Sequence, residues 1–236
     1  MTSKPESKSV SRRKFLKGSA VATGLAAAGT VAMPNVSRAQ TVTLKMQSSW
    51  GASDIFQEMA KQYTDRCEKM AGGRLKFDLL PAGAVVKAFE VQNACHTGVL
   101  DAAHTVSAYW YGKNKAASLF GTGPVFGCDA TQMLAWIQSP DGRALYKELT
   151  QGILKLDIVG FFAMPMPTQP LGWFKKQITS AADMQGLKYR TVGLATDIMQ
   201  GMGLKVTQLP GGEIIHALER GVIEAFEINN PTSDRQ

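Results

Sequence analysis

The chain has 236 residues, of which 44% are hydrophobic and 19% are charged, with 23 Gly, 10 Pro and three Cys. This composition suits one large or two small globular domains and excludes a disordered or collagen-like chain. Three cysteines are too few for a disulfide scaffold. Residues 1–39 carry seven of the 26 Lys and Arg but only one of the 19 Asp and Glu. The net charge of +7 therefore belongs mainly to the N-terminus, which argues against a nucleic-acid partner.

The N-terminus has the three-part pattern of an export signal. Residues 12–17 read RRKFLK, an Ala/Gly-rich stretch occupies residues 18–33, and residues 37–39 (SRA) offer small side chains at a cleavage site. The twin arginine resembles the signal of the Tat pathway. We therefore expect residues 1–39 to be a Tat signal peptide that directs a soluble protein to the periplasm. A permanent N-terminal anchor is the alternative, which the shortness of the apolar stretch disfavours.

The first part of the remaining chain alternates strand and helix patterns, which predicts a parallel sheet. The predicted strands are residues 41–47 and 75–80, and the predicted helices are residues 55–71 and 86–96. Ser53 or Asp54 can cap the first helix. Its apolar positions follow the 3.6-residue period and are expected to face the core: Ile55, Met59, Tyr63, Cys67 and Met70.

The middle and last thirds contain further predicted elements. Helical patterns at residues 131–137 and 143–149 precede a strongly apolar predicted strand at residues 156–163. The last third reads as strand, helix, strand, helix, strand, at residues 187–192, 195–202, 204–209, 213–220 and 222–228. Short connections between such elements predict right-handed crossovers and a doubly wound sheet.

Most motifs of catalytic chemistry are missing from the sequence. It contains no dinucleotide fingerprint, no Walker lysine pattern and no G-x-S-x-G turn. The spacing of its Cys and His residues matches no transition-metal site, and no pair of residues suits nucleophilic catalysis.

Three polar residues lie near the ends of predicted strands, where open α/β sheets bind their ligands. Arg190 and Glu227 lie near the ends of two strands, and Gln169 follows a third. Arg190 offers a planar fork that fits a carboxylate, and Glu227 would pair with it or hold a small cation. An Arg–Glu pair on the surface is the alternative, and sequence spacing does not decide between them.

Around these residues the chain resembles a known family. The stretches that carry the resemblance are LPAGAVV (80–86), GVLDAAH (98–104), YWYGK (109–113), Gln169 with GWF (172–174), GLKYR (186–190) and LERGVIEAFEI (218–228). Together they resemble the periplasmic solute-binding subunits of TRAP (tripartite ATP-independent periplasmic) transporters, of the dicarboxylate and 2-oxo-acid binding (DctP) type. The similarity extends over essentially all of the chain that follows the leader.

The resemblance implies an α/β, periplasmic-binding-protein-like fold of two doubly wound lobes with a cleft between them. It places residues 40–163 mainly in lobe I and residues 164–236 mainly in lobe II. Family members continue beyond position 236, so we expect the chain to be C-terminally incomplete and its second lobe to lack strands and a long helix.

The resemblance also implies roles for particular residues. Arg190 would clamp the substrate carboxylate in a bidentate ion pair, with Trp110 as a wall of the cleft. Gln169 would contact both the substrate and, in the 2-oxo-acid branch, a bound Na or Ca ion that bridges to it. Glu227 and the backbone carbonyl of Ile228 would complete that cation site. Ile228 stands where a tryptophan often sits in that branch, which leaves the substrate and the cation open.

The function implied is binding, not catalysis. The protein would capture an organic acid (a 2-oxo acid, another monocarboxylate or a C4-dicarboxylate) and deliver it to TRAP membrane subunits, as a monomer or a homodimer. The alternative is a Tat-exported, cofactor-dependent periplasmic enzyme, which the missing motifs disfavour. An ABC-type binding protein would share the architecture but not the order of the motifs.

Overall fold

The computed structural model describes residues 40–121, 128–163, 166 and 169–229. The chain divides into two compact units, residues 1–40 and 41–236, and the description below concerns the second. The predicted signal peptide and the last seven residues lie outside the described residues. In the described part of the chain, no helix is both long enough and apolar enough to cross a membrane.

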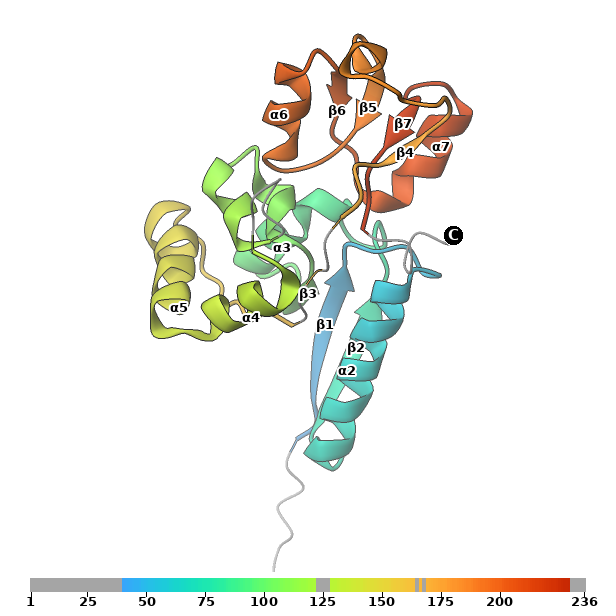
Figure 1. Ribbon diagram of the computed structural model, residues 1–236. Coiled ribbons are helices and arrows are strands. Elements are labelled where there is room, and N and C mark those ends of the chain that lie inside the picture. The colour runs from blue at the N-terminus through green and yellow to red at the C-terminus, as the bar shows by residue number, and fades with distance from the viewer. Residues whose placement is uncertain (1–39, 122–127, 164–165, 167–168, 230–236) are drawn as a thin grey trace, which may run out of the picture. The chain divides into compact units, whose positions relative to one another are not determined.

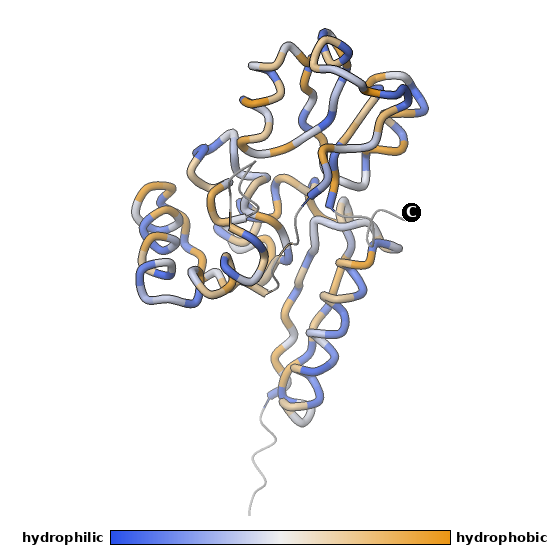
Figure 2. Tube along the Cα trace, viewed as in Figure 1, coloured by the Kyte–Doolittle hydropathy of each residue, from blue (hydrophilic) through white to orange (hydrophobic). Residues whose placement is uncertain are grey.

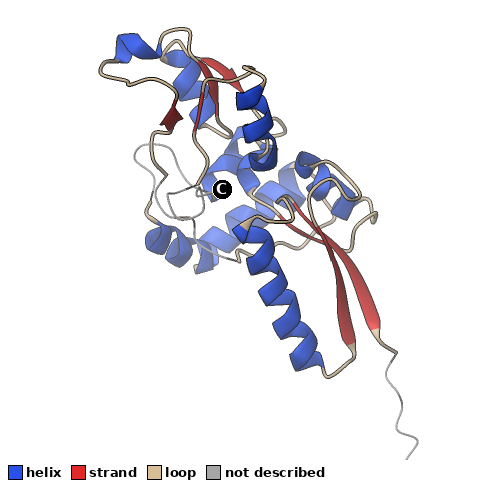
Figure 3. Ribbon diagram, turned by 90° about the vertical axis from the view of Figure 1, so that its right-hand side faces the viewer, coloured by secondary structure: helices blue, strands red, loops and turns tan. Residues whose placement is uncertain are grey.

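The N-terminal sheet contains three parallel strands in the order β2-β1-β3 (Figure 1). Strand β1 (Val42–Ser48) pairs with β2 (Leu75–Leu80) along its length, and its end pairs with β3 (Ala102–His104). Helix α2 (Ile55–Ala71) joins β1 to β2 and runs alongside both strands (Figure 3). The parallel sheet expected from the sequence is thereby confirmed.

Helix α2 begins and ends at the residues that its capping signals predict. The Asp54 carboxylate accepts a hydrogen bond from the Phe56 N–H at 2.8 Å, and Gly72 ends the helix in the left-handed conformation. Figure 2 shows hydrophilic residues along much of the helix.

The predicted apolar face of α2 is wrong. Met59, Tyr63 and Met70 are 41%, 58% and 77% exposed. The buried stripe lies one residue further along and contains Phe56, Ala60 and Thr64. Neighbouring stripes on a helix differ by only 100° of rotation, so a tertiary contact can choose between them. Here the ring of Phe56 packs on Trp50, with 5.0 Å between the ring centroids, and this contact fixes the rotation.

A short helical region follows β2. The predicted helix at residues 86–96 is shorter than expected, because a 3-10 turn (Ala88–Glu90) replaces its first part and α3 covers only Val91–His96. Two more 3-10 helices follow β3, at Ser107–Trp110 and Lys115–Phe120. The first of them contains Tyr109 and Trp110 of the aromatic run, and Tyr111 follows it directly.

Helices α4 (Ala130–Gln138) and α5 (Pro140–Lys147) confirm the two helices predicted in the middle of the chain. A capping box between Asp129 and Gln132 begins α4, and a π turn (Glu148–Ile153) extends α5.

The strand predicted at residues 156–163 is wrong. This stretch is irregular, and its Val159 and Phe161 are 75% and 87% exposed. A strand needs a neighbour for its backbone groups, and no strand of the described residues pairs with this one. Side chains bind part of its backbone instead: Asp157 N–H donates to His96 Nδ1 at 2.9 Å, and Gln151 Nε2 donates to the carbonyl of Ile158 at 2.8 Å.

The C-terminal sheet has four strands in the order β4-β7-β5-β6 (Figure 1). Its members are β4 (Trp173–Phe174), β5 (Lys188–Arg190), β6 (Lys205–Thr207) and β7 (Ala225–Phe226), with α6 (Ala195–Gly201) and α7 (Ile214–Glu219) between strands. Strand β5 is parallel to β6 and β7, which confirms the predicted strand–helix alternation, whereas β4 is antiparallel to β7. The strands are shorter than predicted.

The core of this second sheet is apolar. Its buried members are Met184, Leu187, Tyr189, Met199, Leu204 and Ala225. The alternation along β5 places Tyr189 in this core, so the next residue, Arg190, points to the other face of the sheet.

Candidate functional site

The register of β5 and β7 brings Arg190 and Glu227 together. Arg190 lies opposite Phe226 in the parallel pair, and the N–H of Glu227, the next residue, donates to the Arg190 carbonyl at 3.1 Å. Both residues therefore stand at the carboxyl ends of adjacent strands, which is where open sheets place their ligands.

The guanidinium of Arg190 is held on one side. Its Nε donates to the carbonyl of Leu209 at 2.8 Å, and its Nη1 donates to the Glu227 carbonyl at 2.5 Å and to the Glu227 carboxylate at 3.4 Å. Its Nη2 forms no hydrogen bond to any described residue. Since Arg190 and Glu227 are only 2% and 7% exposed, they do not form the surface pair that the sequence left open. The anchored fork keeps donors in reserve for an external acceptor.

Glu227 has a second protein partner in the same strand edge. Thr191 Oγ1 donates to the Glu227 carboxylate at 2.7 Å, in a buried position. Arg190 and Glu227 carry opposite unit charges, so the pair is neutral as a whole. A buried pair of this kind is stable only while both members are present, because either one alone would be an uncompensated buried charge.

Gln169 reaches the same edge from the other direction. Because β4 runs antiparallel to β7, with Trp173 opposite Phe226, the chain before β4 passes the end of β7. Gln169 Nε2 there donates to the carbonyl of Ile228. Gly172 makes the approach possible, since its φ is +149° and a Cβ would lie 2.6 Å from the Phe226 carbonyl oxygen.

The residues around Ile228 suit a hard cation. They offer the amide of Gln169, the carbonyl of Ile228 and the carboxylate of Glu227, which are oxygen donors of the kind that Na and Ca ions bind. An amide side chain presents its oxygen in place of its nitrogen after a half-turn. Among the described residues, no group of three or more His, Cys, Asp and Glu could hold a metal ion.

Trp110 forms no hydrogen bond to these residues. It is 5% exposed and packs in a core cluster with Ala117, Phe120 and Leu149. Its neighbour Tyr109 points toward the site instead: the Gly211 N–H donates to Tyr109 Oη at 3.2 Å. Burial raises the pKa of Tyr109, and the nearby charge of Arg190 partly opposes this rise.

Tyr109 is a site residue that the sequence did not single out. It belongs to an aromatic wall with Phe89 and Trp50, whose ring centroids lie 4.6 Å and 6.1 Å from its own. The only signal in the sequence was the run of aromatic residues at 109–111. The 3-10 turn decides which of them faces the site, because three residues per turn point successive side chains in different directions.

A half-buried histidine supports this wall. Trp50 Nε1 donates to His104 Nδ1 at 2.9 Å, so Nδ1 must be unprotonated. Burial lowers the pKa of His104, which keeps the imidazole neutral and preserves this acceptor.

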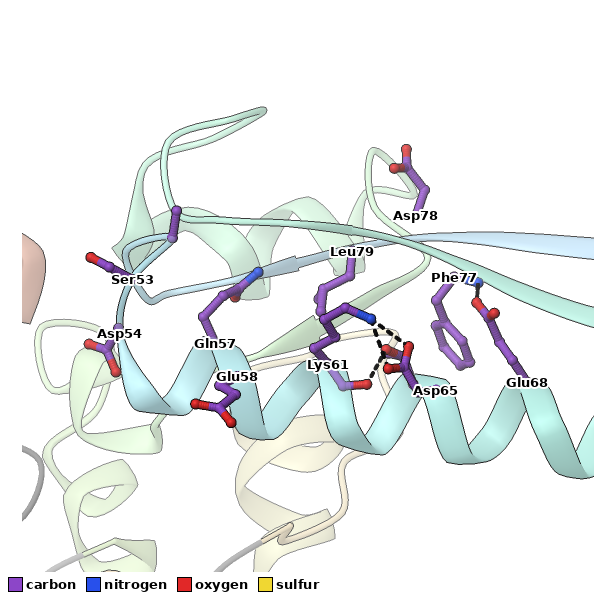
Figure 4. Close-up of a pocket in the computed structure, with 12 residues that line it drawn as sticks. Ser53, Asp54, Gln57, Glu58, Lys61, Asp65, Glu68, Phe77, Asp78 and Leu79 are labelled. Atoms are coloured by element: carbon purple, nitrogen blue, oxygen red, sulfur yellow. Dashed lines mark hydrogen bonds and ion pairs between the residues drawn. The ribbon is translucent and has the colours of Figure 1, made fainter.

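A groove of about 670 Å³ lies along α2 and β2, and it is a poor place for an organic anion (Figure 4). Five carboxylates line it, and its one lysine, Lys61, pairs with one of them, Asp65, at 2.8 Å. An excess of negative charge repels a second carboxylate. Neither Arg190 nor Gln169 lines this groove.

Comparison with known proteins assigns the chain to a family. Residues 46–236 match the family described as "Bacterial extracellular solute-binding protein, family 7" (DctP). A curated relative from Nostoc sp., named a monocarboxylate 2-oxoacid-binding periplasmic protein, is 34% identical over 229 residues, which are 95% of this chain and 62% of the relative. The chain belongs to this family of solute-binding proteins.

Solved structures agree. A TRAP transporter solute-binding protein from Bordetella bronchiseptica, with calcium and picolinate bound, matches with a TM-score of 0.76 at 31% identity, over 83% of this chain and 57% of that one. A second, from Colwellia psychrerythraea with calcium and pyruvate bound, matches with a TM-score of 0.72 at 31% identity, over 83% and 58% of the two chains.

These matches confirm the α/β, periplasmic-binding-protein-like fold class and the TRAP DctP-type family expected from the sequence. The chain spans about three-fifths of the length of these relatives. They are transport solute-binding proteins, and the alternative of a cofactor-dependent enzyme finds no support among them.

Proposed function

We propose that this protein is a TRAP solute-binding subunit that captures a small organic acid at Arg190. The observation that carries the proposal is the buried, anchored guanidinium of Arg190. Its Nε and Nη1 are fixed by Leu209 and Glu227, while Nη2 is bonded to no described residue. A carboxylate held by such a donor, away from water, gains more than it would at the surface.

A cation on Gln169, Glu227 and Ile228 would complete the charge balance. The Arg190–Glu227 pair is neutral, so by itself it has little net attraction for an anion. A bound Na or Ca ion would supply the positive charge that a carboxylate ligand needs and would offer it a direct oxygen contact. Glu227 holds its place for this task through Thr191, and Gln169 through the turn at Gly172.

The ligand class follows from the relatives. Those of 31% identity contain calcium with picolinate or with pyruvate, and the Nostoc protein is named for monocarboxylate 2-oxo acids. Tyr109, Phe89 and Trp50 would provide the apolar wall for the carbon skeleton of such an acid. We therefore place a 2-oxo or similar monocarboxylic acid first among the ligands.

The wider assignment rests on the family and on the leader. Residues 40–163 and 164–236 would be lobe I and lobe II, and the ligand would be handed to TRAP membrane subunits. The twin arginine at residues 12 and 13 supports Tat export to the periplasm. Replacement of both arginines by lysine is expected to leave the precursor uncleaved in the cytoplasm, and unchanged export would contradict the Tat route.

Calorimetric titration of the purified chain tests the ligand assignment. Metal-stripped protein is titrated with pyruvate, picolinate and succinate, each with NaCl, with CaCl2 and with neither. We expect binding of at least one acid, and tighter binding with a cation than without it. If no acid binds in any of the three conditions, the proposed function is wrong. Gln169→Leu should abolish the effect of the cation while leaving the protein folded.

A further inference from the structure

Asp197 joins two segments that are far apart in the sequence. Its carboxylate accepts a hydrogen bond from Tyr111 Oη at 2.6 Å and two from Lys115 Nζ, at 2.8 Å and 3.1 Å. Lys115 Nζ also lies 5.4 Å from the centre of the Tyr111 ring. The partners are separated by 86 and 82 residues, so the contact exists only while segment 107–118 lies against segment 190–197.

The same two segments meet again at Gly193, whose backbone lies close to side chains of segment 107–118. Gly193 has a φ of +68°, and a Cβ there would lie 2.9 Å from Ser118 Oγ and 3.3 Å from Ala108 Cβ. The side chains of Ser118 and Ala108 therefore lie directly against the backbone of Gly193, which contributes no side chain of its own. Tyr109 makes a third contact nearby, through Gly211.

Polar groups at this contact lack partners. Ser118 Oγ and Thr196 Oγ1 are buried and form no hydrogen bond to any described residue. Permanent cores satisfy nearly all such groups, because an unpaired buried hydroxyl costs free energy. In a contact surface that opens and closes, water forms hydrogen bonds to these hydroxyls whenever the surface is open, so they do not need protein partners.

We propose that Asp197, with Tyr111 and Lys115, forms a clasp that holds segment 107–118 on segment 190–197. The clasp sets the fraction of protein in which the two segments, and with them the aromatic wall and Arg190, are closed on each other. This inference rests on the proposed function in one respect, namely that a ligand is enclosed when the segments meet. The clasp itself consists only of residues of this chain.

The geometry makes the strength of the clasp depend on solution conditions. The side chains of Lys115 and Asp197 are 62% and 40% exposed, so salt can weaken their attraction. Hydrogen bonds from Lys115 and Tyr111 lower the pKa of Asp197, which keeps the carboxylate charged. Closure also leaves the hydroxyls of Ser118 and Thr196 without hydrogen bonds, which costs free energy. The clasp offsets only part of this cost, so it does not lock the segments together.

The test measures the separation of the segments in ligand-free protein. Nitroxide labels replace Arg66 on α2 and His216 on α7, both exposed, in a chain whose three cysteines are changed to serine. Double electron–electron resonance then reports the distribution of distances. Lys115→Met and Asp197→Asn remove the clasp, and far-UV circular dichroism verifies that each variant is folded.

Lys61→Met is the matched control, because Lys61 forms an equally short exposed pair with Asp65 within α2. We expect Lys115→Met and Asp197→Asn to raise the ratio of long to short distances about 2- to 5-fold, as the loss of an exposed ion pair implies. NaCl at about 1 M should raise this ratio by a similar factor in the parent and should change it little in Asp197→Asn. Lys61→Met should change nothing.

Distance distributions of Lys115→Met and Asp197→Asn that match the Lys61→Met control would overturn the clasp. The proposed function is tested separately by adding pyruvate and CaCl2 to the labelled parent, which should close the segments further. A parent that ignores both additions counts against the ligand assignment, whereas the comparison of ligand-free variants still decides on the clasp.

Discussion

Arg190 and Glu227 stand at the ends of adjacent parallel strands, one residue out of register, and the Arg190 guanidinium contacts both the carbonyl and the carboxylate of Glu227. This relationship explains how a charged side chain is stable at 2% exposure. Glu227 neutralises the arginine and orients it, so the remaining donors point in a fixed direction before any ligand arrives. Such preorganisation lowers the entropic cost of binding a ligand.

The first prediction concerns the stability of this pair. Arg190→Ala should lower the free energy of unfolding by about 3–5 kcal/mol, because it leaves the Glu227 carboxylate buried without its counter-charge. The double variant Arg190→Met/Glu227→Gln should recover much of this loss. Urea denaturation of the parent, Arg190→Met, Glu227→Gln and the double variant measures the coupling. Losses that simply add in the double variant would contradict a buried, interdependent pair.

Tyr109 and Trp110 should respond differently to replacement by Phe. Tyr109→Phe removes the oxygen that binds the Gly211 N–H, so we expect weaker pyruvate binding with little change in thermal stability. Trp110→Phe leaves a cavity in the core cluster, so we expect a loss of about 1–3 kcal/mol in unfolding free energy with little change in affinity. If instead Trp110→Phe weakened pyruvate binding and Tyr109→Phe lowered the stability, Trp110 and not Tyr109 would line the ligand site.

Gly172 should tolerate no side chain. In Gly172→Ala the new Cβ would meet the Phe226 carbonyl oxygen at a backbone φ of +149°, so the chain before β4 must shift. We expect a loss of about 2 kcal/mol or more in stability and a weaker cation site, because Gln169 moves with this segment. Gly201→Ala at the end of α6 is the control, since nothing lies within 4 Å of its added Cβ. Equal stability of the two variants would be evidence against this constraint.

His104 should make stability depend on pH on the acid side. Its pKa is lowered from 6.5 in the folded state, so below pH 6.5 the unfolded chain takes up a proton that the folded protein refuses. The free energy of unfolding should therefore fall as the pH drops below 6.5, by at most about 1.4 kcal/mol per pH unit from this group, and level off below the folded pKa. Above pH 6.5 the group should have no effect.

His104→Asn removes the titration but keeps an acceptor near Trp50, so the difference in unfolding free energy between parent and variant should be independent of pH above 6.5 and should change with pH below it. His216→Asn is the control, because the His216 side chain is 74% exposed. Parallel pH profiles of parent and His104→Asn would show that His104 is not the group responsible.

The sequence predicted the alternating sheets well because their signals are local. The caps of α2 at Asp54 and Gly72 and the strand–helix pattern of residues 187–228 depend on near neighbours. The orientation of α2 and the strand at residues 156–163 could not be predicted in the same way. The first depends on the packing of Phe56 against Trp50, and the second on a pairing partner for its backbone.

The site was predictable where strand ends define it. Arg190 and Glu227 meet because the parallel strands β5 and β7 end at a common edge, as their strand patterns predict. Gln169 reaches Ile228 in a different way, because β4 runs back along β7, and not through the strand expected at residues 156–163. The aromatic wall was not predictable in detail. Whether Tyr109 or Trp110 faces Arg190 depends on the phase of a single 3-10 turn, which the composition of the run does not reveal.

The most direct test of the account is the affinity of Arg190→Lys for pyruvate in the presence of CaCl2. Lysine keeps the charge next to Glu227, so the protein should fold, but it lacks the second arm of the fork that would meet the ligand. Calorimetry should show a Kd raised about 10- to 100-fold, with calcium binding preserved. A Kd within twofold of the parent's value would contradict the central claim that Arg190 holds the carboxylate.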